Sequence, residues 1–508
     1  MTRHLPLAAL AVLLGLSLFA GLRGVDFGRH WDERHLVQQA TTALKTELLL
    51  PRSYHYPSVP FWLTTAALAV GDDAAAAATS PSLRPDGQRT AVPPPPAVAA
   101  DPILRIRSFF LIFSALIGLW TYLAGRAAGL RSWPAVLGAG LVIGSFELAY
   151  HQRWIAPDAV MAQLAALTLW LLLRARLDPR WLLPAAVAAG LCCGTKYTGG
   201  LLLLGVLFVA VTGPTGRLRR TLLGGATFAA SYLATTPGTL LDHGLFWRHL
   251  TYEIEHYAQG HGSYSVDGFA SHLALAGRWL ADSALAPWPL LAVGLAALAL
   301  FGAGVVARPI RVWRGDGRRF LLLGLPLLYL LFMARQRVFI TRNLLILLPF
   351  VAILAAVASQ ALLDRLRPGG RRWVVGGLLA LPVAATLGFQ LHASQTIHNR
   401  RTPQALAAFT AWCAAHPELA AHASPRLQHA LGGATGACLT TGAARAYALY
   451  LSEGQPDSRR WPTLGEAWPE VVFGPVDVNL RWYGSWLGDD RIVVVDRATA
   501  ERLHVAVP

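Results

Sequence analysis

The chain has 508 residues, of which 54% are hydrophobic and only 14% are charged. Because soluble domains carry about 25% charged residues, this composition excludes an ordinary soluble protein. Nearly uncharged stretches at 134–150, 156–173 and 343–363 approach the roughly 20 apolar residues that span a bilayer. The formal net charge is +16. Such a charge is typical of nucleic-acid-binding proteins, but the positions of the charges indicate another origin.

Apolar runs predict a mainly α-helical transmembrane bundle with about eleven spans. The first run shows no small-residue cleavage site after it, so we interpret it as a retained span and not as a signal peptide. The short apolar stretch 59–70 is interpreted as an interfacial or re-entrant helix, because a full span there would reverse every later loop. The predicted spans lie near 5–22, 105–125, 133–150, 157–173, 181–194, 198–213, 221–238, 285–307, 320–333, 343–363 and 373–390.

Arginines in the connecting loops predict the orientation. If the N-terminus is cytoplasmic, five short loops on the cytoplasmic side hold 17 arginines and three aspartates, so 14 of the 16 net positive charges lie there. Cytoplasmic loops are enriched in Lys and Arg. We therefore expect a multi-pass protein of the cell inner (plasma) membrane with a cytoplasmic N-terminus and no nucleic-acid partner. The five loops are 126–131, 174–180, 217–220, 308–319 and 364–372.

The other side of the membrane then receives two long loops, a short turn and the C-terminal region. A helical pattern at 403–415 and strand-like runs at 471–473 and 491–495 predict a small extracytoplasmic α/β domain. Cys413 and Cys438 in that domain could form a disulfide. The expected domains are a membrane domain at 1–390, with outer loops at 23–104 and 239–284, and a C-terminal domain at 391–508.

Three carboxylates are candidate catalytic residues on the outer side. Asp32 and Glu33 follow the first span beside Trp31. Acids on loops are commonly only solvated, but partial desolvation near the membrane surface makes a carboxylate more basic. Asp32 could then take a proton from an acceptor hydroxyl. Asp158 opens a later span, where a purely structural role as a helix cap is the alternative.

Four cations stand out because they lie on the outer side or at membrane depth. Arg153, Arg337 and Arg342 break the charge asymmetry, and Lys196 lies beside Tyr197 in a turn between two short apolar segments. Charges at membrane depth are costly and indicate function, and arginines suit an anionic group such as phosphate. Snorkelling of Lys196 and contact of the arginines with lipid headgroups are the alternatives.

A histidine-rich stretch lies in the loop 239–284. His249, Glu253 and His256 have the spacing i, i+4 and i+7 of one helical face, and His261 follows. Such a face could hold a divalent metal ion, and we expect no other cofactor. Hydrogen bonding of substrate by His256 and His261 is the favoured interpretation.

Several short motifs together resemble the GT-C glycosyltransferases, in particular the protein O-mannosyltransferases and lipid A aminoarabinose transferases. The resemblance covers roughly residues 1–390. The motifs are an acidic pair after the first span (32–33), a Tyr-Pro motif that includes Tyr56 (54–60), the turn 153–158, the Gly-x-Lys-Tyr turn 194–197, the stretch 256–261 and the Arg…Leu-Pro pattern 342–349. Position 58 departs from the usual pattern, because it holds Ser where a second proline is common.

The resemblance implies a polyprenyl-phosphate sugar donor, an envelope acceptor that is a lipid, glycan or protein, and inversion at the anomeric carbon. It implies that Asp32 is the general base and that Glu33 or Asp158 orients a substrate. Lys196, Arg153, Arg337 and Arg342 would bind the donor phosphate, with Tyr56 and Tyr197 among the substrate contacts. The alternatives are a transporter or flippase of lipid-linked sugars, for which no sequence repeat is evident, and a non-catalytic receptor.

Overall fold

The computed structural model of the 508-residue chain divides into two compact units. The first comprises residues 1–19, 36–82 and 105–390, and the second comprises residues 20–35, 83–104 and 391–508. The residues that the structure describes are 4–26, 33–70, 102–213, 216–260, 264–280, 317–366, 369–399, 402–424, 427–428, 431, 436–442, 444, 446–451, 471–473, 491–496, 498 and 500.

The first unit is built from helices. Its α-helices are α1 (Leu5–Arg23), α2 (Glu33–Thr46), α3 (Val59–Ala69), α5 (Pro102–Ala115), α6 (Ile117–Ala127), α7 (Ser132–Gly144), α8 (Phe146–His151), α9 (Pro157–Leu177), α10 (Leu182–Cys193), α11 (Leu203–Thr212), α12 (Arg217–Thr235), α13 (Gly238–Leu241), α14 (His243–Gln259), α15 (Phe269–Trp279), α18 (Leu325–Ala334), α19 (Leu348–Arg365) and α20 (Gly370–Asn399). Of these, α1, α2, α5 and α20 continue into the second unit. Short 3-10 helices are η1 (Pro179–Trp181), η2 (Tyr197–Leu202) and η6 (Thr341–Leu347), and η5 (Phe320–Gly324) is a π-helical turn.

Within the described residues, five helical segments are long and apolar enough to cross a membrane: 5–23, 102–127, 157–177, 341–365 and 373–395. Further apolar helices of 10–17 residues include 132–144, 179–193, 197–212 and 320–334. The chain is therefore a multi-pass membrane protein. The expected span 285–307 lies outside the described residues.

Two expected spans are interrupted helices. The stretch 133–150 divides at Ser145, whose backbone leaves the helical region (ψ 120°) and whose hydroxyl accepts a hydrogen bond from the Leu148 amide. This N-cap begins α8 as a separate turn. The stretch 105–125 divides at Leu116 into α5 and α6. Helix α8 carries two buried ionisable residues, Glu147 and His151.

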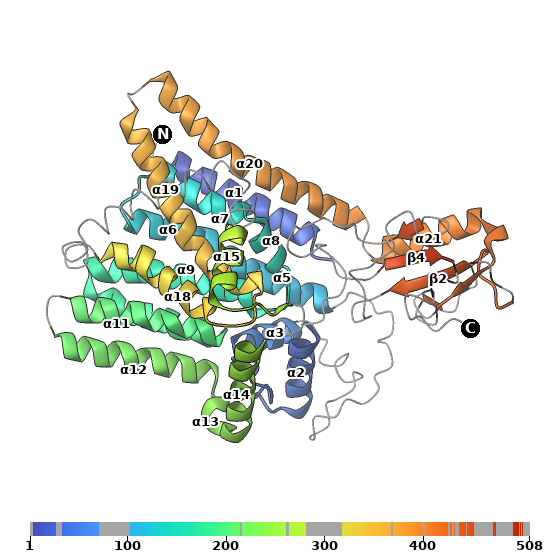
Figure 1. Ribbon diagram of the computed structural model, residues 1–508, viewed down its shortest axis with the longest axis horizontal. Coiled ribbons are helices and arrows are strands. Elements are labelled where there is room, and N and C mark those ends of the chain that lie inside the picture. Colours follow the sequence, from blue (N-terminus) through green and yellow to red (C-terminus); the bar gives the residue numbers. More distant parts are fainter. Residues whose placement is uncertain are drawn as a thin grey trace. The chain divides into compact units, whose positions relative to one another are not determined.

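Small residues let the helices of the first unit pack closely. Helix α10 packs between α9 and α12, and a Cβ at Gly190 would lie 2.6 Å from the carbonyl oxygen of Phe228 on α12. That separation is far shorter than any normal contact, so glycine is required for this approach. Helix α7 likewise packs on α6 and α19. In Figure 1, α11 and α12 lie side by side, and α14 crosses their direction.

The second unit contains a small mixed sheet with helix α21 (Thr402–Ala415). The strands are β1 (Ala421–Ala423), β2 (Ala446–Leu451), β3 (Val471–Phe473) and β4 (Arg491–Val495), and the short 3-10 helix η7 (Pro417–Leu419) precedes β1. The strand order is β1-β2-β4-β3. Strand β2 is parallel to β1 and antiparallel to β4, which is antiparallel to β3.

A compact apolar core fixes α21 on this sheet. Alternate residues such as Ala446 and Ala448 on β2, and Ile492 and Val494 on β4, contribute to the core together with Phe409 of α21. These alternate residues share one face of the sheet, and the residues between them, such as Leu449 and Val493, are buried as well. Cys413 of α21 and Cys438 form a disulfide within the core, which realises the pairing that the sequence left open.

Candidate active site

Asp158 lies in the first turn of α9, directly after Pro157. Its side chain is fully buried, and its Oδ1 atom accepts a hydrogen bond of 2.6 Å from Nζ of Lys196. The N-cap of α9 is Ala156, which offers no capping side chain. Asp158 is therefore more than a helix cap, because one carboxylate oxygen is used in a buried ion pair.

Lys196 comes to Asp158 from the turn between α10 and η2. This turn is ordered by a hydrogen bond from the Gly199 amide to the Lys196 carbonyl oxygen. The ammonium group is buried and makes a second hydrogen bond, 2.5 Å long, to Oδ1 of Asn343. A buried ammonium group is tolerable only with such partners, so the lysine is an internal residue and not a snorkelling one.

The segment η6 contributes Arg342 to the site. Nε of Arg342 lies 3.7 Å from Oδ2 of Asp158, an ion pair just beyond hydrogen-bond distance. The Arg342 guanidinium also lies 5.9 Å from the centre of the Trp154 ring, within the range of a cation–π interaction. Two cations thus converge on one carboxylate in a buried space.

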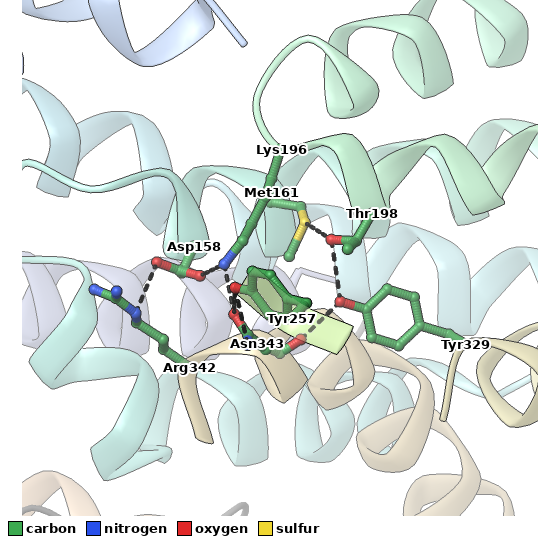
Figure 2. A network of polar contacts seen from close by, with 8 residues as sticks. All are labelled: Asp158, Met161, Lys196, Thr198, Tyr257, Tyr329, Arg342 and Asn343. Atoms are coloured by element: carbon green, nitrogen blue, oxygen red, sulfur yellow. Dashed lines mark hydrogen bonds and ion pairs between the residues drawn. The ribbon is translucent and has the colours of Figure 1, made fainter. Parts of the chain in front are cut away.

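Two tyrosines that sequence reasoning did not assign complete the network (Figure 2). The Tyr257 hydroxyl on α14 lies 3.5 Å from Oδ1 and 3.4 Å from Nδ2 of Asn343. The Tyr329 hydroxyl donates to the backbone carbonyl of Asn343 at 2.8 Å. We call Asp158, Lys196, Tyr257, Arg342 and Asn343 the Asp158 cluster. Asn343 and Tyr329 each carried a weak signal, a hydrogen-bonding side chain within or beside an apolar run.

A second group of contacts joins the first outer loop to α14. The Tyr54 amide donates to Nδ1 of His249 at 3.0 Å. Nδ1 of His55 lies 2.8 Å from Oε1 of Glu253, and the His55 and His249 rings stack with centres 4.5 Å apart. We call Tyr54, His55, His249 and Glu253 the loop contact. Its link to the Asp158 cluster is Tyr197, whose hydroxyl donates to the Tyr54 carbonyl at 2.7 Å.

These contacts correct the expected metal site of His249, Glu253 and His256. Among the described residues, no group of three or more His, Cys, Asp or Glu side chains could hold a metal ion. Glu253 pairs with His55 of the first loop, and the His256 ring stacks on Tyr252 at 5.8 Å. The helical spacing places the three residues on one face, but the Glu253 carboxylate pairs with His55, which is distant in the sequence.

The remaining predicted residues lie as follows. Arg153 is buried, and its guanidinium donates to the Ala149 carbonyl of α8. Burial lowers the pKa of Arg153 to about 9, so it stays positively charged at pH 7. Arg337 is exposed, and its amide donates to the Tyr257 carbonyl at 2.9 Å. Glu33 is buried as the first residue of α2, Tyr56 is half-buried in the first loop, and Asp32 and His261 lie outside the described residues.

Comparisons with known proteins agree with this fold. Residues 97–236 match the family model of dolichyl-phosphate-mannose-protein mannosyltransferases. The Archaeoglobus fulgidus oligosaccharyltransferase is similar over 86% of this chain and 64% of its own, with a TM-score of 0.50 and 13% identity. ArnT from Cupriavidus metallidurans, crystallised with undecaprenyl phosphate, is 15% identical over 97% of this chain and 98% of its own, with a TM-score of 0.49. A comparison with curated protein sequences gives no match.

The predicted resemblance to the GT-C membrane glycosyltransferases is confirmed for residues 97–236 by the family model and for the fold by the archaeal enzyme. The range matched by the family model contains Asp158 and Lys196, the two residues with the shortest side-chain ion pair of the cluster. The chain spans about two thirds of the length of the archaeal oligosaccharyltransferase. The similarity to that enzyme therefore shows the fold alone. The chemistry of this chain depends on its own residues.

Proposed function

We propose that this protein is an inverting glycosyltransferase that moves a sugar from a polyprenyl-phosphate donor to a hydroxyl group of an envelope acceptor. The observation that carries the proposal is the buried Asp158 cluster, with Lys196 and Arg342 against a single carboxylate. Electrostatic attraction is much stronger in a buried space than in water. Two buried cations side by side therefore suit a phosphate group that gains negative charge as it leaves the sugar.

The cluster assigns separate tasks to its members. Lys196 and Arg342 would bind the donor phosphate, and Asp158 would orient both cations through its two oxygens. Asn343 and Tyr257 would hold the Lys196 ammonium group in place. Arg153 and Arg337 are further candidate phosphate ligands, on the basis of charge alone.

Asp32 would serve as the general base, with Glu33 orienting the acceptor. The acceptor oxygen would attack the anomeric carbon on the face opposite the phosphate, and Asp32 would take the hydroxyl proton. The carbon–oxygen bond to phosphate would break, and the phosphate would leave as a dianion on its lipid. The configuration at the anomeric carbon inverts in this single displacement.

The reaction would take place on the extracytoplasmic side. The Cys413–Cys438 disulfide supports this placement, because disulfides persist in oxidising compartments outside the cytoplasm. The asymmetry of the arginine-rich loops supports a cytoplasmic N-terminus and about eleven spans. The C-terminal unit would then be an extracytoplasmic α/β domain.

The test is a deletion strain of the source organism, complemented with variants and examined by mass spectrometry of its lipids and envelope glycans. Deletion should remove one sugar from an envelope glycan or glycolipid and raise the level of the matching polyprenyl-phosphate sugar. Asp32→Asn should reproduce the deletion while the protein still reaches the membrane. Asp267→Asn, a change of the same type at an exposed residue of another outer loop, should behave like the wild type. Full activity of Asp32→Asn would exclude Asp32 as the base.

A further inference from the structure

A buried carboxylate on α8 lies outside the proposed chemistry. Glu147 is fully buried, and neither of its carboxylate oxygens has a hydrogen-bond partner among the described residues. Its Oε2 atom lies 3.7 Å from Nε2 of His151, one helical turn later. Burial of a carboxylate without hydrogen bonds is costly, so the contact of Glu147 with the His151 ring matters for its stability.

Aromatic contacts connect this pair to the Asp158 cluster. The His151 ring, which is 1% exposed, packs edge-on against the Trp154 ring, with centres 4.7 Å apart. Tyr150 packs against the same indole ring at 4.8 Å. The buried Trp154 ring in turn lies 5.9 Å from the Arg342 guanidinium. The chain of contacts runs from α8 through the turn 152–156 to η6.

We propose that Trp154 is a positioning residue, held by His151 and Glu147, that keeps Arg342 aligned on Asp158 and ready to receive a phosphate. Arg342 is beyond hydrogen-bond distance of Asp158, so the carboxylate alone does not fix the plane of the guanidinium. An aromatic face restricts that plane, and a guanidinium held in a fixed plane suits the geometry of a phosphate. The inference rests on the proposed function, because it assigns Trp154 to the same donor-phosphate site.

The first measurement is binding of undecaprenyl phosphate to the full chain in detergent. Trp154→Leu removes the aromatic face, and we expect binding about 2- to 30-fold weaker, the range of a cation–π interaction of about 0.5–2 kcal/mol. Trp154→Phe retains an aromatic face and should restore most of the affinity. Trp247→Leu is the matched control, because Trp247 is 60% exposed on α14, and it should leave binding unchanged.

A double-mutant cycle separates positioning from a merely structural role. In an Arg342→Gln background, Trp154→Leu should weaken binding no further, because the residue through which it acts is absent. If the leucine variant does not fold, His151→Gln takes its place in the same cycle, with a smaller loss expected.

Two results would overturn the inference in different ways. Unchanged binding by Trp154→Leu, or an equal loss with and without Arg342, would remove the positioning role and leave the proposed function intact. Failure of the wild-type protein to bind undecaprenyl phosphate at any concentration tested would overturn the proposed function and this inference with it.

Discussion

The Asp158 cluster and the loop contact are both built from ionisable residues, but they differ in depth. Asp158 and Lys196 have side chains that are 0% and 7% exposed, whereas those of Glu253 and His55 are 20% and 41% exposed. The charges of Asp158 and Lys196 need hydrogen-bond partners within the protein, whereas Glu253 and His55 can also form hydrogen bonds with water. The difference distinguishes a buried charged cluster from a partly solvated contact between a loop and a helix.

The largest effect should come from Lys196→Met. This change leaves the buried Asp158 carboxylate with its close ammonium partner removed. Breaking a buried pair in this way costs about 3–5 kcal/mol of unfolding free energy. Chemical unfolding of the full chain in detergent measures the loss, and binding of undecaprenyl phosphate should also disappear. A stability within about 1 kcal/mol of the wild type would mean that the pair is solvated like a surface pair.

The double variant Asp158→Asn with Lys196→Met sharpens that result. Removing both charges eliminates the unpaired carboxylate, so much of the lost stability should return. Phosphate binding should not return, because the cation is still missing. Recovery of binding together with stability would show that Lys196 acts only on the fold.

Substitution at Gly238 should have an intermediate effect and act on the loop contact alone. A Cβ at this first residue of α13 would lie 2.0 Å from the hydroxyl oxygen of Tyr54. The buried Tyr54 ring would have to move, and overpacking of this kind costs about 1–3 kcal/mol. Hydrogen exchange of residues 50–58 should rise in Gly238→Ala, while exchange around Asp158 stays unchanged. Gly244→Ala is the control, since a Cβ there meets no atom within 4 Å.

The smallest effect should be a pH dependence of the loop contact. Burial and the neighbouring His55 ring lower the pKa of His249 below its ordinary value of 6.5, with a contribution from Arg248, while Asp242 and Glu253 act in the opposite direction. The neutral ring is the favoured form, because Nδ1 of His249 must accept the Tyr54 amide hydrogen. This stabilisation is present above pH 6.5 and is lost as the pH falls through the lower pKa of the folded state.

Hydrogen exchange of the Tyr54 amide as a function of pH, corrected for intrinsic exchange, measures this loss. His249→Gln keeps an acceptor but does not titrate, so its protection should be flat between pH 7 and about pH 5. Equal pH dependence in both proteins would assign the effect to another group.

Asp158, Lys196 and Arg342 were singled out in the sequence as separate candidates: Lys196 because a charge at membrane depth is costly, Arg342 because it breaks the charge asymmetry, and Asp158 because it opens a span. Their pairing was not predicted, and the structure brings all three together. Asn343, Tyr257 and Tyr329 were not assigned to the cluster, because hydrogen-bonding side chains beside apolar runs are common and their partners are distant in the chain. The prediction of a metal site on α14 was wrong because the partner of Glu253, His55, is likewise distant in the chain. Helical spacing shows which residues share a face but gives no information about the loop that packs on it.

The helix break at Ser145 was also not predicted from the sequence. The run 133–150 is apolar enough to be interpreted as one span, and Glu147 and His151 do not interrupt it strongly. The serine side chain ends one helix and begins the next through a single local hydrogen bond. Hydropathy averages over such a local event, so it predicted the element but not its interruption.

Two residues of helix α14 connect the first loop to η6. Glu253 contacts His55 of the first loop and Tyr257 contacts Asn343 of η6, and the two residues are one turn apart on the same side of the helix. A helix turn is about 5.4 Å long and stiff, so α14 cannot rotate enough to release one contact without straining the other. Helix α14 therefore couples the two contacts. If the first loop moves and α14 moves with it, the Tyr257 side chain must move as well. Tyr257 contacts the Asn343 amide group that lies beside Lys196.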